Sequence, residues 1–282
     1  MTTLTYSIVV TTPMPLKPCL KWVGGKTQIL DKVFALFPAT MRSYHEPFVG
    51  GGSVLIELLE RRRAGTLTLT GTIYASDLNP HLITLYQTIQ RSPTELIAAL
   101  QRLAATYTAC TGTVPNRAPL TEPEGRESKE SYYYWIRARF NTVTLDPVER
   151  AATFLFLNKT CFRGLYREGP RGFNVPFGHY KNPGIYEEAT IRGLSALFAD
   201  VVFTHAPFTQ SLAATRVQDG DFVYLDPPYA PIDATSFIGY TAAGFDAAAH
   251  DTLFKEIAGI PQKGASALMS NADVELVRKG RV

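Results

Sequence analysis

The sequence predicts an α/β fold built on a doubly wound sheet. A strand is expected at residues 44–49, followed by the turn Gly50-Gly51-Gly52 and by a helix over residues 53–62. Residues 66–75 are again rich in β-forming side chains and stop at Ser76-Asp77-Leu78-Asn79-Pro80. This order of strand, glycine loop, helix, strand and acidic residue is typical of the opening of a doubly wound sheet.

The same alternation returns in the last third of the chain. Short apolar runs at residues 201–208 and 221–225 predict two more strands. A helix is expected at residues 247–257 and a further strand at residues 267–270. We therefore expect both ends of the chain to build one sheet.

The middle of the chain has a different character. Residues 81–103 and 132–158 follow a helical pattern, residues 111–131 read as an exposed polar loop, and residues 159–183 are irregular and rich in Gly, aromatic and Arg residues. We interpret this part as a mostly helical insertion. The predicted division is a leader at 1–15, an α/β domain formed by 16–84 and 186–282, and an inserted domain at 85–185.

Composition narrows the class of protein. The 282 residues are 45% hydrophobic with a net charge of +3, so the chain reads as globular and any affinity for polyanions must come from local clustering. The three cysteines and five histidines are scattered, which predicts neither a disulfide framework nor a metal site. No signal peptide or membrane-spanning run is recognisable, so we expect a cytoplasmic protein without a membrane partner.

The segment Asp226-Pro227-Pro228-Tyr229 follows the apolar run at residues 222–225. Two prolines end a strand and remove two backbone donors, which leaves nearby carbonyl groups without competing N–H groups. A carboxylate, free carbonyls and an aromatic ring at the end of a strand could hold an exocyclic amine attached to a heterocycle. The alternative is a proline-rich turn with a solvated Asp226 and a locally packed Tyr229.

The glycine loop that contains Phe48, Gly50 and Gly52 leads from a strand into a helix. Glycines allow close approach of a ligand, and the start of a helix favours negative charge such as a carboxylate. Asp77, at the end of the next strand, is placed to accept hydrogen bonds from ribose hydroxyls. The alternative for Asp77 is an N-cap of the following helix.

A short apolar piece at residues 20–26 turns through two glycines into a helix expected at residues 27–37. Its Gly24-Gly25-Lys26-Thr27 is not a phosphate-binding loop of nucleoside triphosphatases, because Leu20 stands where that motif requires glycine. Trp22 and Lys26 could instead hold an adenine ring and a carboxylate. The alternative is a core tryptophan and a solvated lysine.

Basic, aromatic and amide side chains alternate in residues 158–183. Such side chains can contact base edges, bind phosphates and insert between bases. The alternative is an ordinary solvated loop. The predicted contact residues are Lys159, Arg163, Tyr166, Arg167, Arg171, Asn174 and Lys181.

The pieces WVGGK, FVGGG, SDLN and DPPY stand in that order, with the phrases NKTCFRGLYR and FNVPFGHYKNP between the last two. This arrangement resembles the Dam-like (D12 class) DNA adenine-N6 methyltransferases over about residues 16–280. The resemblance implies a Rossmann-like sheet that binds S-adenosylmethionine and an inserted DNA-recognition domain. Double-stranded DNA would be the partner, and a hairpin at about residues 158–183 would read it.

The resemblance also implies roles for particular residues. Trp22 and Lys26 match the first cofactor motif of the family, and Asp77 matches its ribose-binding acid. The methionine-cradling loop is matched by Phe48, Gly50 and Gly52, and the catalytic motif by Asp226, Pro227 and Tyr229, with Asp226 also in the cofactor site. Thr160 to Arg171 match the segment that enters the major groove.

The chemistry implied is transfer of a methyl group to adenine N6, without a metal. Hydrogen bonds accepted by Asp226 and by the Pro227 carbonyl would make the amine a better nucleophile, and Tyr229 would stack on the flipped base. GATC is the expected target, because the hairpin resembles that of GATC-modifying members. Methylation of cytosine N4 or of RNA adenine, and a weakly active or inactive DNA-binding relic, are the alternatives.

The expected C-terminal part departs from the family. Members usually continue after the strand matched by ALMSN through a helix and a β-hairpin, whereas this sequence stops at Val282. We therefore expect the last strands of the sheet to be missing. A monomer is expected, and a cognate restriction endonuclease is a partner that the resemblance implies, although a solitary or phage-borne role stays open.

Overall fold

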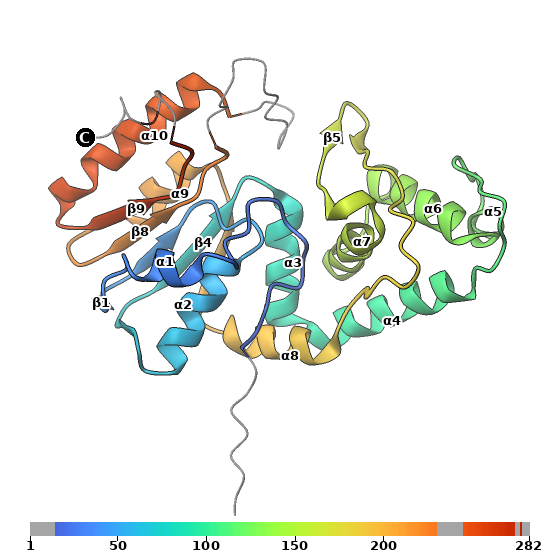
Figure 1. Ribbon diagram of the computed structural model, residues 1–282, viewed down its shortest axis with the longest axis horizontal. Helices are drawn as coiled ribbons and strands as arrows, with labels where there is room; N and C mark the ends of the chain where they lie inside the picture. The colour runs from blue at the N-terminus through green and yellow to red at the C-terminus, as the bar shows by residue number, and fades with distance from the viewer. Residues whose placement is uncertain (1–14, 230–244, 274–276, 278–282) are drawn as a thin grey trace, which may run out of the picture.

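A five-stranded parallel sheet forms one half of the molecule (Figure 1). The computed structural model describes residues 15–229, 245–273 and 277. Across the sheet the strand order is β7-β4-β2-β8-β9. The strands are β2 (Tyr44–Glu46), β4 (Ile73–Asp77), β7 (Val201–His205), β8 (Phe222–Leu225) and β9 (Ser266–Met269). The prediction of an α/β fold with a parallel sheet is confirmed.

The direction of winding reverses at the centre of the sheet. The chain passes from β2 outward to β4 and β7, and then continues with β8 and β9 on the other side of β2. Tyr44 of β2 lies opposite Phe222 of β8. Open sheets of this kind bind ligands outside the carboxyl ends of the strands, at the point where the winding reverses. The topology therefore points to the space beyond β2 and β8.

Two of the expected strands have different bounds in the structure. Pro47 has no N–H group, so β2 ends at Glu46, three residues before the expected end of that strand. The β-rich stretch at 66–75 forms two strands, β3 (Thr68–Leu69) and β4, and β3 pairs with β1 (Thr40–Met41) in a small separate sheet.

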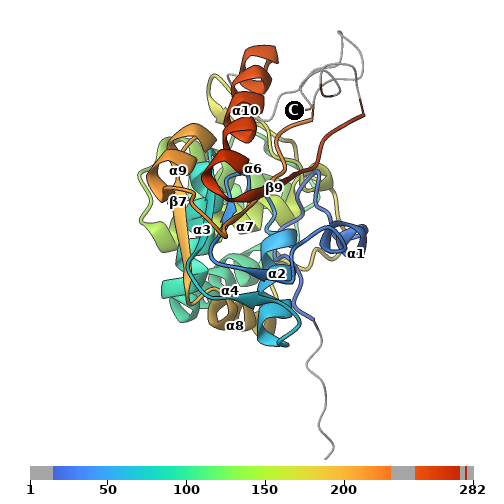
Figure 2. The same ribbon diagram turned by 90° about the vertical axis from the view of Figure 1, so that its left-hand side faces the viewer.

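Alternate side chains of β8 enter two layers of the core. Phe222 and Tyr224 join the large cluster, whereas Val223 and Leu225 pack with Leu253 of α10 (Ala247–Gly259). Figures 1 and 2 show α10 and α2 (Ser53–Arg63) on opposite sides of the sheet. The apolar run at 222–225 is thus a strand buried on both faces.

Helix α3 begins at residues that sequence rules favour. Asn79 caps α3 by accepting from the N–H group of His81 at 2.9 Å, with Pro80 in the first turn. The other helical elements are α1 (Leu30–Phe34), α3 (Pro80–Arg91), α4 (Pro93–Ala109), α5 (Glu122–Arg126), α6 (Lys129–Thr142), α7 (Pro147–Thr160), η1 (Phe162–Gly164), α8 (Glu188–Leu197), α9 (Phe208–Thr215) and η2 (Pro261–Lys263).

The helices from α4 to α7 lie beside the sheet, to the right in Figure 1, with α3 between the two parts. Helix α3 packs on β4 and β7 and also on α7, so one continuous core runs through both parts. The expected single helix at 81–103 is divided at Ser92, because Pro93 starts a new helix. The expected loop at 111–131 was wrong in part, since it contains α5 and the start of α6.

A small hairpin stands in the segment expected to be irregular. Strand β5 (Glu168–Gly169) pairs antiparallel with β6 (Gly172–Phe173), and Pro170 and Arg171 form the turn between them. Gly172 has φ +85°, a conformation that suits glycine at this turn.

Two expectations concern the ends of the chain. The leader at 1–15 falls almost wholly outside the described residues. The absence of closing strands concerns the chain beyond β9, of which only a few residues are described, so it stays a prediction.

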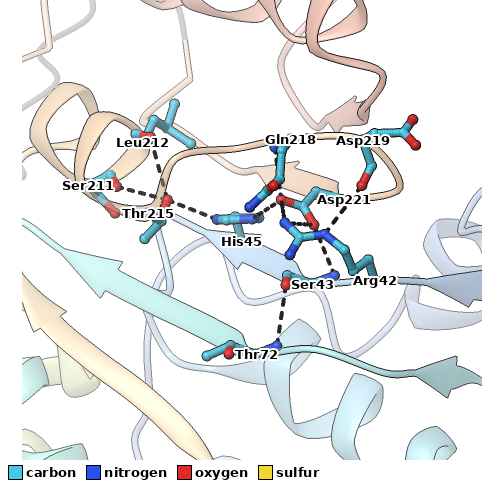
Figure 3. Close-up of polar contacts among 10 residues, drawn as sticks. All are labelled: Arg42, Ser43, His45, Thr72, Ser211, Leu212, Thr215, Gln218, Asp219 and Asp221. Atoms are coloured by element: carbon cyan, nitrogen blue, oxygen red, sulfur yellow. Dashed lines mark hydrogen bonds and ion pairs between the residues drawn. The ribbon is translucent and has the colours of Figure 1, made fainter.

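A buried polar network fixes the amino ends of β2 and β8 to one another (Figure 3). The Asp221 carboxylate is fully buried and accepts hydrogen bonds from the backbone N–H groups of Ser43 and Gln218, each at 3.0 Å. It also contacts Arg42 at 2.7 Å and the His45 Nε2 atom at 3.0 Å. Burial lowers the pKa of His45, so the neutral ring donates from Nε2 to Asp221. This network lies at the opposite end of the strands from Glu46 and Asp226.

Candidate active site

A pocket of about 540 Å³ opens at the carboxyl ends of the central strands. Glu46, Asp77 and Asp226 stand at or just beyond the ends of β2, β4 and β8, and all three line it. Its size lies in the range of pockets that hold cofactors and drug-sized molecules. Its position matches the point of reversed winding in the sheet.

Asp226 and Lys26 form an ion pair inside this pocket. The Lys26 Nζ atom lies 2.5 Å from Asp226 Oδ2 and 2.7 Å from the carbonyl oxygen of Gly24. The lysine is only 5% exposed and the aspartate side chain 20% exposed. The alternatives of a solvated lysine and a solvated aspartate are therefore wrong.

The pair leaves one acceptor unused. Asp226 Oδ1 is buried and has no hydrogen-bond partner among the described residues. A buried acceptor without a partner is unfavourable, unless a ligand supplies the donor.

Burial shapes the ionisation of this pair. It raises the pKa of Asp226 above its usual value, although the Lys26 ammonium acts in the opposite direction. For Lys26, burial lowers the pKa, but the charge and hydrogen bond of Asp226 together with Tyr229 outweigh that effect and the pKa is raised. The lysine therefore stays charged, and perturbed groups of this kind are common at functional sites.

Tyr229 lies close to the same pair. The Lys26 Nζ atom is 5.0 Å from the centre of its ring, and the tyrosine is 40% exposed. Pro227 and Pro228 line the pocket between Asp226 and Tyr229. The structure thus brings the carboxylate, the prolines and an accessible ring together at one wall.

The glycine loop is held in place by Asp77. Its Oδ2 atom accepts from the N–H group of Gly50 at 2.9 Å, and its Oδ1 atom accepts from the N–H group of Asn79 at 2.9 Å. Burial raises the pKa of Asp77, against the lowering effect of these backbone hydrogen bonds. Because Asn79 is the N-cap of α3, the alternative role of Asp77 as that cap is wrong.

Trp22 covers the glycine loop. A β-carbon added at Gly51 would lie 2.8 Å from Trp22 Cβ, and one added at Gly50 would lie 3.3 Å from the indole ring. Gly50 and Gly52 have φ values of +48° and +75°, so both use the conformational freedom of glycine. Trp22 is half-buried. One part of it packs against the core and another lines the pocket, so both expected environments of this residue are present.

Phe48 lies in the same loop and packs against Phe208 and Phe245, with ring centres 5.4 and 5.9 Å away. These aromatic rings form an apolar wall of the pocket.

Glu46 is a pocket residue that the sequence did not single out. It is 3% exposed and accepts a hydrogen bond from the Tyr44 hydroxyl at 2.8 Å. Burial raises the pKa of Glu46 to about 8, although the hydrogen bond from Tyr44 lowers it. Its place as the last strand residue before Pro47 and the glycine loop is the signal that could have identified it.

Glu46 makes stability depend on pH. Its pKa rises from 4.5 to about 8 on folding, so the folded protein binds the extra proton between these values. Stability from this group is therefore present below pH 4.5 and lost as pH rises toward 8. We expect Glu46→Gln to become more stable relative to the parent by up to about 1.4 kcal/mol per pH unit in this window. Denaturant unfolding at pH 5, 6, 7 and 8 measures this.

Glu57 provides the control for that experiment. It lies in α2, is partly exposed and pairs with Arg61, so Glu57→Gln should differ from the parent by a similar amount at each pH. A stability difference for Glu46→Gln that stays flat with pH would show that the carboxyl is ionised throughout.

The seven residues predicted to contact nucleic acid divide into two groups. Lys159 and Tyr166 are partly buried: burial lowers the pKa of Lys159, and the Tyr166 ring lies 5.5 Å from that of Trp22. The exposed ones are Arg163, Arg167, Arg171, Asn174 and Lys181. Arg167 donates from Nε to Asn174 Oδ1 at 2.6 Å, so these two side chains form a unit. Arg171 lies in the turn of the β5–β6 hairpin, Arg167 and Asn174 directly flank its strands, and Arg163 lies in η1 before it.

Within residues 15–229, 245–273 and 277, no group of three or more His, Cys, Asp or Glu side chains is arranged to hold a metal ion. None of the helices there has the length and apolar character needed to cross a membrane.

Comparison with known proteins gives consistent similarities. The model of the D12 class N6 adenine-specific DNA methyltransferases matches residues 22–280. The type II methyltransferase M.MjaIII of Methanocaldococcus jannaschii is 35% identical over 268 residues, covering 92% of this chain and 85% of the relative. The DNA adenine methylase of Escherichia coli K12 is 32% identical over 262 residues, covering 92% and 82%. The type II methyltransferase M1.LlaDCHI of Lactococcus lactis is 30% identical over 269 residues, covering 94% and 84%.

Proposed function

This chain belongs to the D12 class N6 adenine-specific DNA methyltransferases, and from that premise we propose that it methylates adenine N6 in GATC with S-adenosylmethionine as the donor. The observation that carries the proposal is the buried Asp226 Oδ1 atom, which lacks a hydrogen-bond partner among the described residues. The amino group of adenine offers two donor protons, and a flipped adenine would bring them to this wall of the pocket.

The pocket fits the proposed cofactor in size and in charge. S-adenosylmethionine supplies an electrophilic methyl group on a positively charged sulfur. Asp77 and Asp226 line the pocket with two carboxyl groups, which suit the positively charged sulfur of the cofactor. The glycine loop lets the cofactor approach the backbone closely. We assign the adenine ring of the cofactor to Trp22, its methionine part to the loop that contains Phe48, and the ribose to Asp77. Lys26, Gly50 and Gly52 complete the proposed cofactor site.

The residues at the DPPY segment would prepare the amine. Its lone pair is conjugated into the adenine ring, so it is a poor nucleophile until its protons are held out of the ring plane. Asp226 Oδ1 and the carbonyl of Pro227 are the proposed acceptors of these protons, and the exposed ring of Tyr229 is the proposed stacking surface. Attack by N6 would form the N–C bond as the S–C bond of the donor breaks, which would leave the thioether product, and one proton of the methylated amine would then pass to water. Catalysis is by positioning and electrostatics.

Residues 85–185, which include the β5–β6 hairpin, form the proposed DNA-recognition domain. Arg163, Arg167, Arg171 and Lys181 are exposed there, and arginine is suited to reading guanine edges in the major groove. Lys159, Tyr166 and Asn174 complete the proposed DNA-binding set. Because Lys159 and Tyr166 are partly buried, we expect them to support the hairpin more than to contact bases.

Binding of the cofactor is tested by thermal unfolding. A ligand that binds only the folded state at 100 times its Kd adds about 3 kcal/mol of stability. We expect S-adenosylmethionine to raise the Tm by several degrees, and adenosine triphosphate at the same concentration to serve as the control. An unchanged Tm at saturating cofactor would favour an inactive relic.

Transfer of tritiated methyl groups tests the target. Label is expected on a duplex with GATC and not on a matched duplex in which GATC is replaced by GTTC. Label on RNA or on cytosine of a GATC-free duplex would favour the alternative substrates. Label on GATC-free DNA alone would contradict the proposed sequence.

The proposal extends to partners. Two of the relatives are named type II methyltransferases, which supports a cognate restriction endonuclease as a partner of this chain. We further propose a monomer, which sedimentation equilibrium with and without a GATC duplex would test.

A further inference from the structure

Asn158 joins two segments that the proposed function assigns to different ligands. Its Oδ1 atom accepts from the backbone N–H group of Lys21 at 2.9 Å, and its Nδ2 atom donates to the carbonyl oxygen of Lys21 at 2.7 Å. The same Nδ2 atom donates to the carbonyl oxygen of Gly164 at 3.1 Å. The side chain is 3% exposed; its hydrogen bond to Gly164 is buried, and the two to Lys21 are partly buried.

The two segments also touch directly. Gly164 has φ +65°, and a β-carbon added there would lie 2.5 Å from Lys21 Cβ. Lys21 extends to Tyr180, and its Nζ atom lies 4.2 Å from the centre of that ring. The base of the hairpin segment is thus packed onto the loop that leads to Trp22.

Trp22 lies between the hairpin segment and the pocket. Its ring faces Tyr166 of the hairpin segment at 5.5 Å and covers the glycine loop on its other side. A second link runs from Glu168 of β5, which is hydrogen-bonded by Tyr166, to His81 in the first turn of α3 at 3.6 Å. The hairpin segment therefore reaches the glycine loop after β2 through Trp22, and it contacts the start of α3, which follows β4.

We propose that Asn158 is a positioning residue that couples cofactor binding in the pocket to DNA binding at the hairpin. The proposal rests on the proposed function of both sites. A primary amide is suited to the task because it accepts and donates at once, and so fixes the Lys21 backbone relative to Gly164. Neither an aspartate nor an alanine can make all three hydrogen bonds. When ligands move or order these loops, the clamp makes each binding event favour the other.

The test measures the coupling directly. The Kd of S-adenosylhomocysteine, which cannot donate a methyl group, is measured by calorimetry without DNA and with a saturating GATC duplex. The ratio of the two values is the coupling factor, and by linkage the duplex Kd must change by the same factor. For the parent protein we expect a factor of at least about 5, as is typical of coupled sites. For Asn158→Asp we expect a factor within about 2 of unity on the same scale.

Asn141 offers a matched control. Its amide also clamps a backbone segment from both sides, at 2.9 Å to the N–H group and 2.9 Å to the carbonyl oxygen of Phe173. It ties the hairpin to α6, and it makes no hydrogen bond to Lys21 or Gly164 within the described part of the chain. Asn141→Asp is expected to weaken DNA binding and to leave the coupling factor unchanged.

Each outcome has a distinct meaning. If the parent binds neither ligand, the proposed function is wrong. If it binds both ligands and Asn158→Asp keeps the parental coupling factor, the coupling role of Asn158 is overturned. A coupling factor that falls equally in Asn141→Asp would overturn it too. Should Asn158→Asp fail to unfold cooperatively, Tyr166→Leu removes the ring that faces Trp22, and it must lower the coupling factor for the proposal to stand.

Discussion

Replacing Asp226 with asparagine is expected to lower the rate of methyl transfer by about 100- to 1,000-fold, the loss seen when one preorganised polar contact to a reacting group is removed. Asparagine keeps the shape of the side chain and can still accept from Lys26, whose buried ammonium lies 2.5 Å from Asp226 Oδ2. It loses the charge and places an amide donor where an acceptor for the amine is needed. Single-turnover transfer to a GATC duplex measures the effect.

Asp221 provides a matched control at the other end of the same strand. Both acids flank β8 and both pair with a cation, but Asp221 is fully buried and lies away from the pocket, whereas Asp226 is partly exposed to it. Asp221→Asn is expected to lower stability and to retain the rate per folded molecule. Retention of the parental rate in Asp226→Asn would remove Asp226 from the chemistry.

Replacing Asp221 with alanine is expected to reduce the free energy of unfolding by about 3–5 kcal/mol, the usual loss when one member of a buried ionic network is removed. The carboxylate is fully buried, and its loss leaves the N–H groups of Ser43 and Gln218 without their acceptor (Figure 3). The partly exposed Arg42 can recover hydration, so the backbone groups and His45 carry most of the effect. Urea unfolding measures it.

Asp200 provides the surface comparison. It is 74% exposed and pairs with Arg62 at 3.6 Å, so Asp200→Ala should change the stability by less than about 1 kcal/mol. A comparably small loss for Asp221→Ala would mean that water or a neighbouring group replaces the carboxylate, and that the amino ends of β2 and β8 are held by packing alone.

Much of the site was predictable because its parts follow rules of local sequence. Prolines after an apolar run end a strand, so the place of Asp226 followed from its neighbours. Glycines between a strand and a helix indicated the loop at Gly50, and the acid at the end of the next strand indicated Asp77. Three such ends meet at one edge of a parallel sheet, and so the pocket itself followed from the order of the elements.

Other features could not be predicted because they depend on partners distant in sequence. Glu46 and Tyr44 give no sign in the sequence that burial will raise the pKa of the carboxyl to about 8. Asn158 lies 137 residues from Lys21, and its role as a clamp depends on how the two segments pack. The division of the helical part at Pro93 and the helix α5 in the expected loop also show that local pattern fixes element type better than element bounds.

The family, the parallel sheet and the position of the DPPY segment at the end of a strand could be read from the chain alone, because each depends on short local motifs and on their order. The pairing of Asp226 with Lys26, 200 residues away, is visible only in the folded chain, as is the burial of one of its oxygens without a partner among the described residues. The packing of Tyr166 against Trp22 is likewise visible only there. The reason is physical: burial, and the electrostatics that follow from it, arise only when distant segments exclude water together.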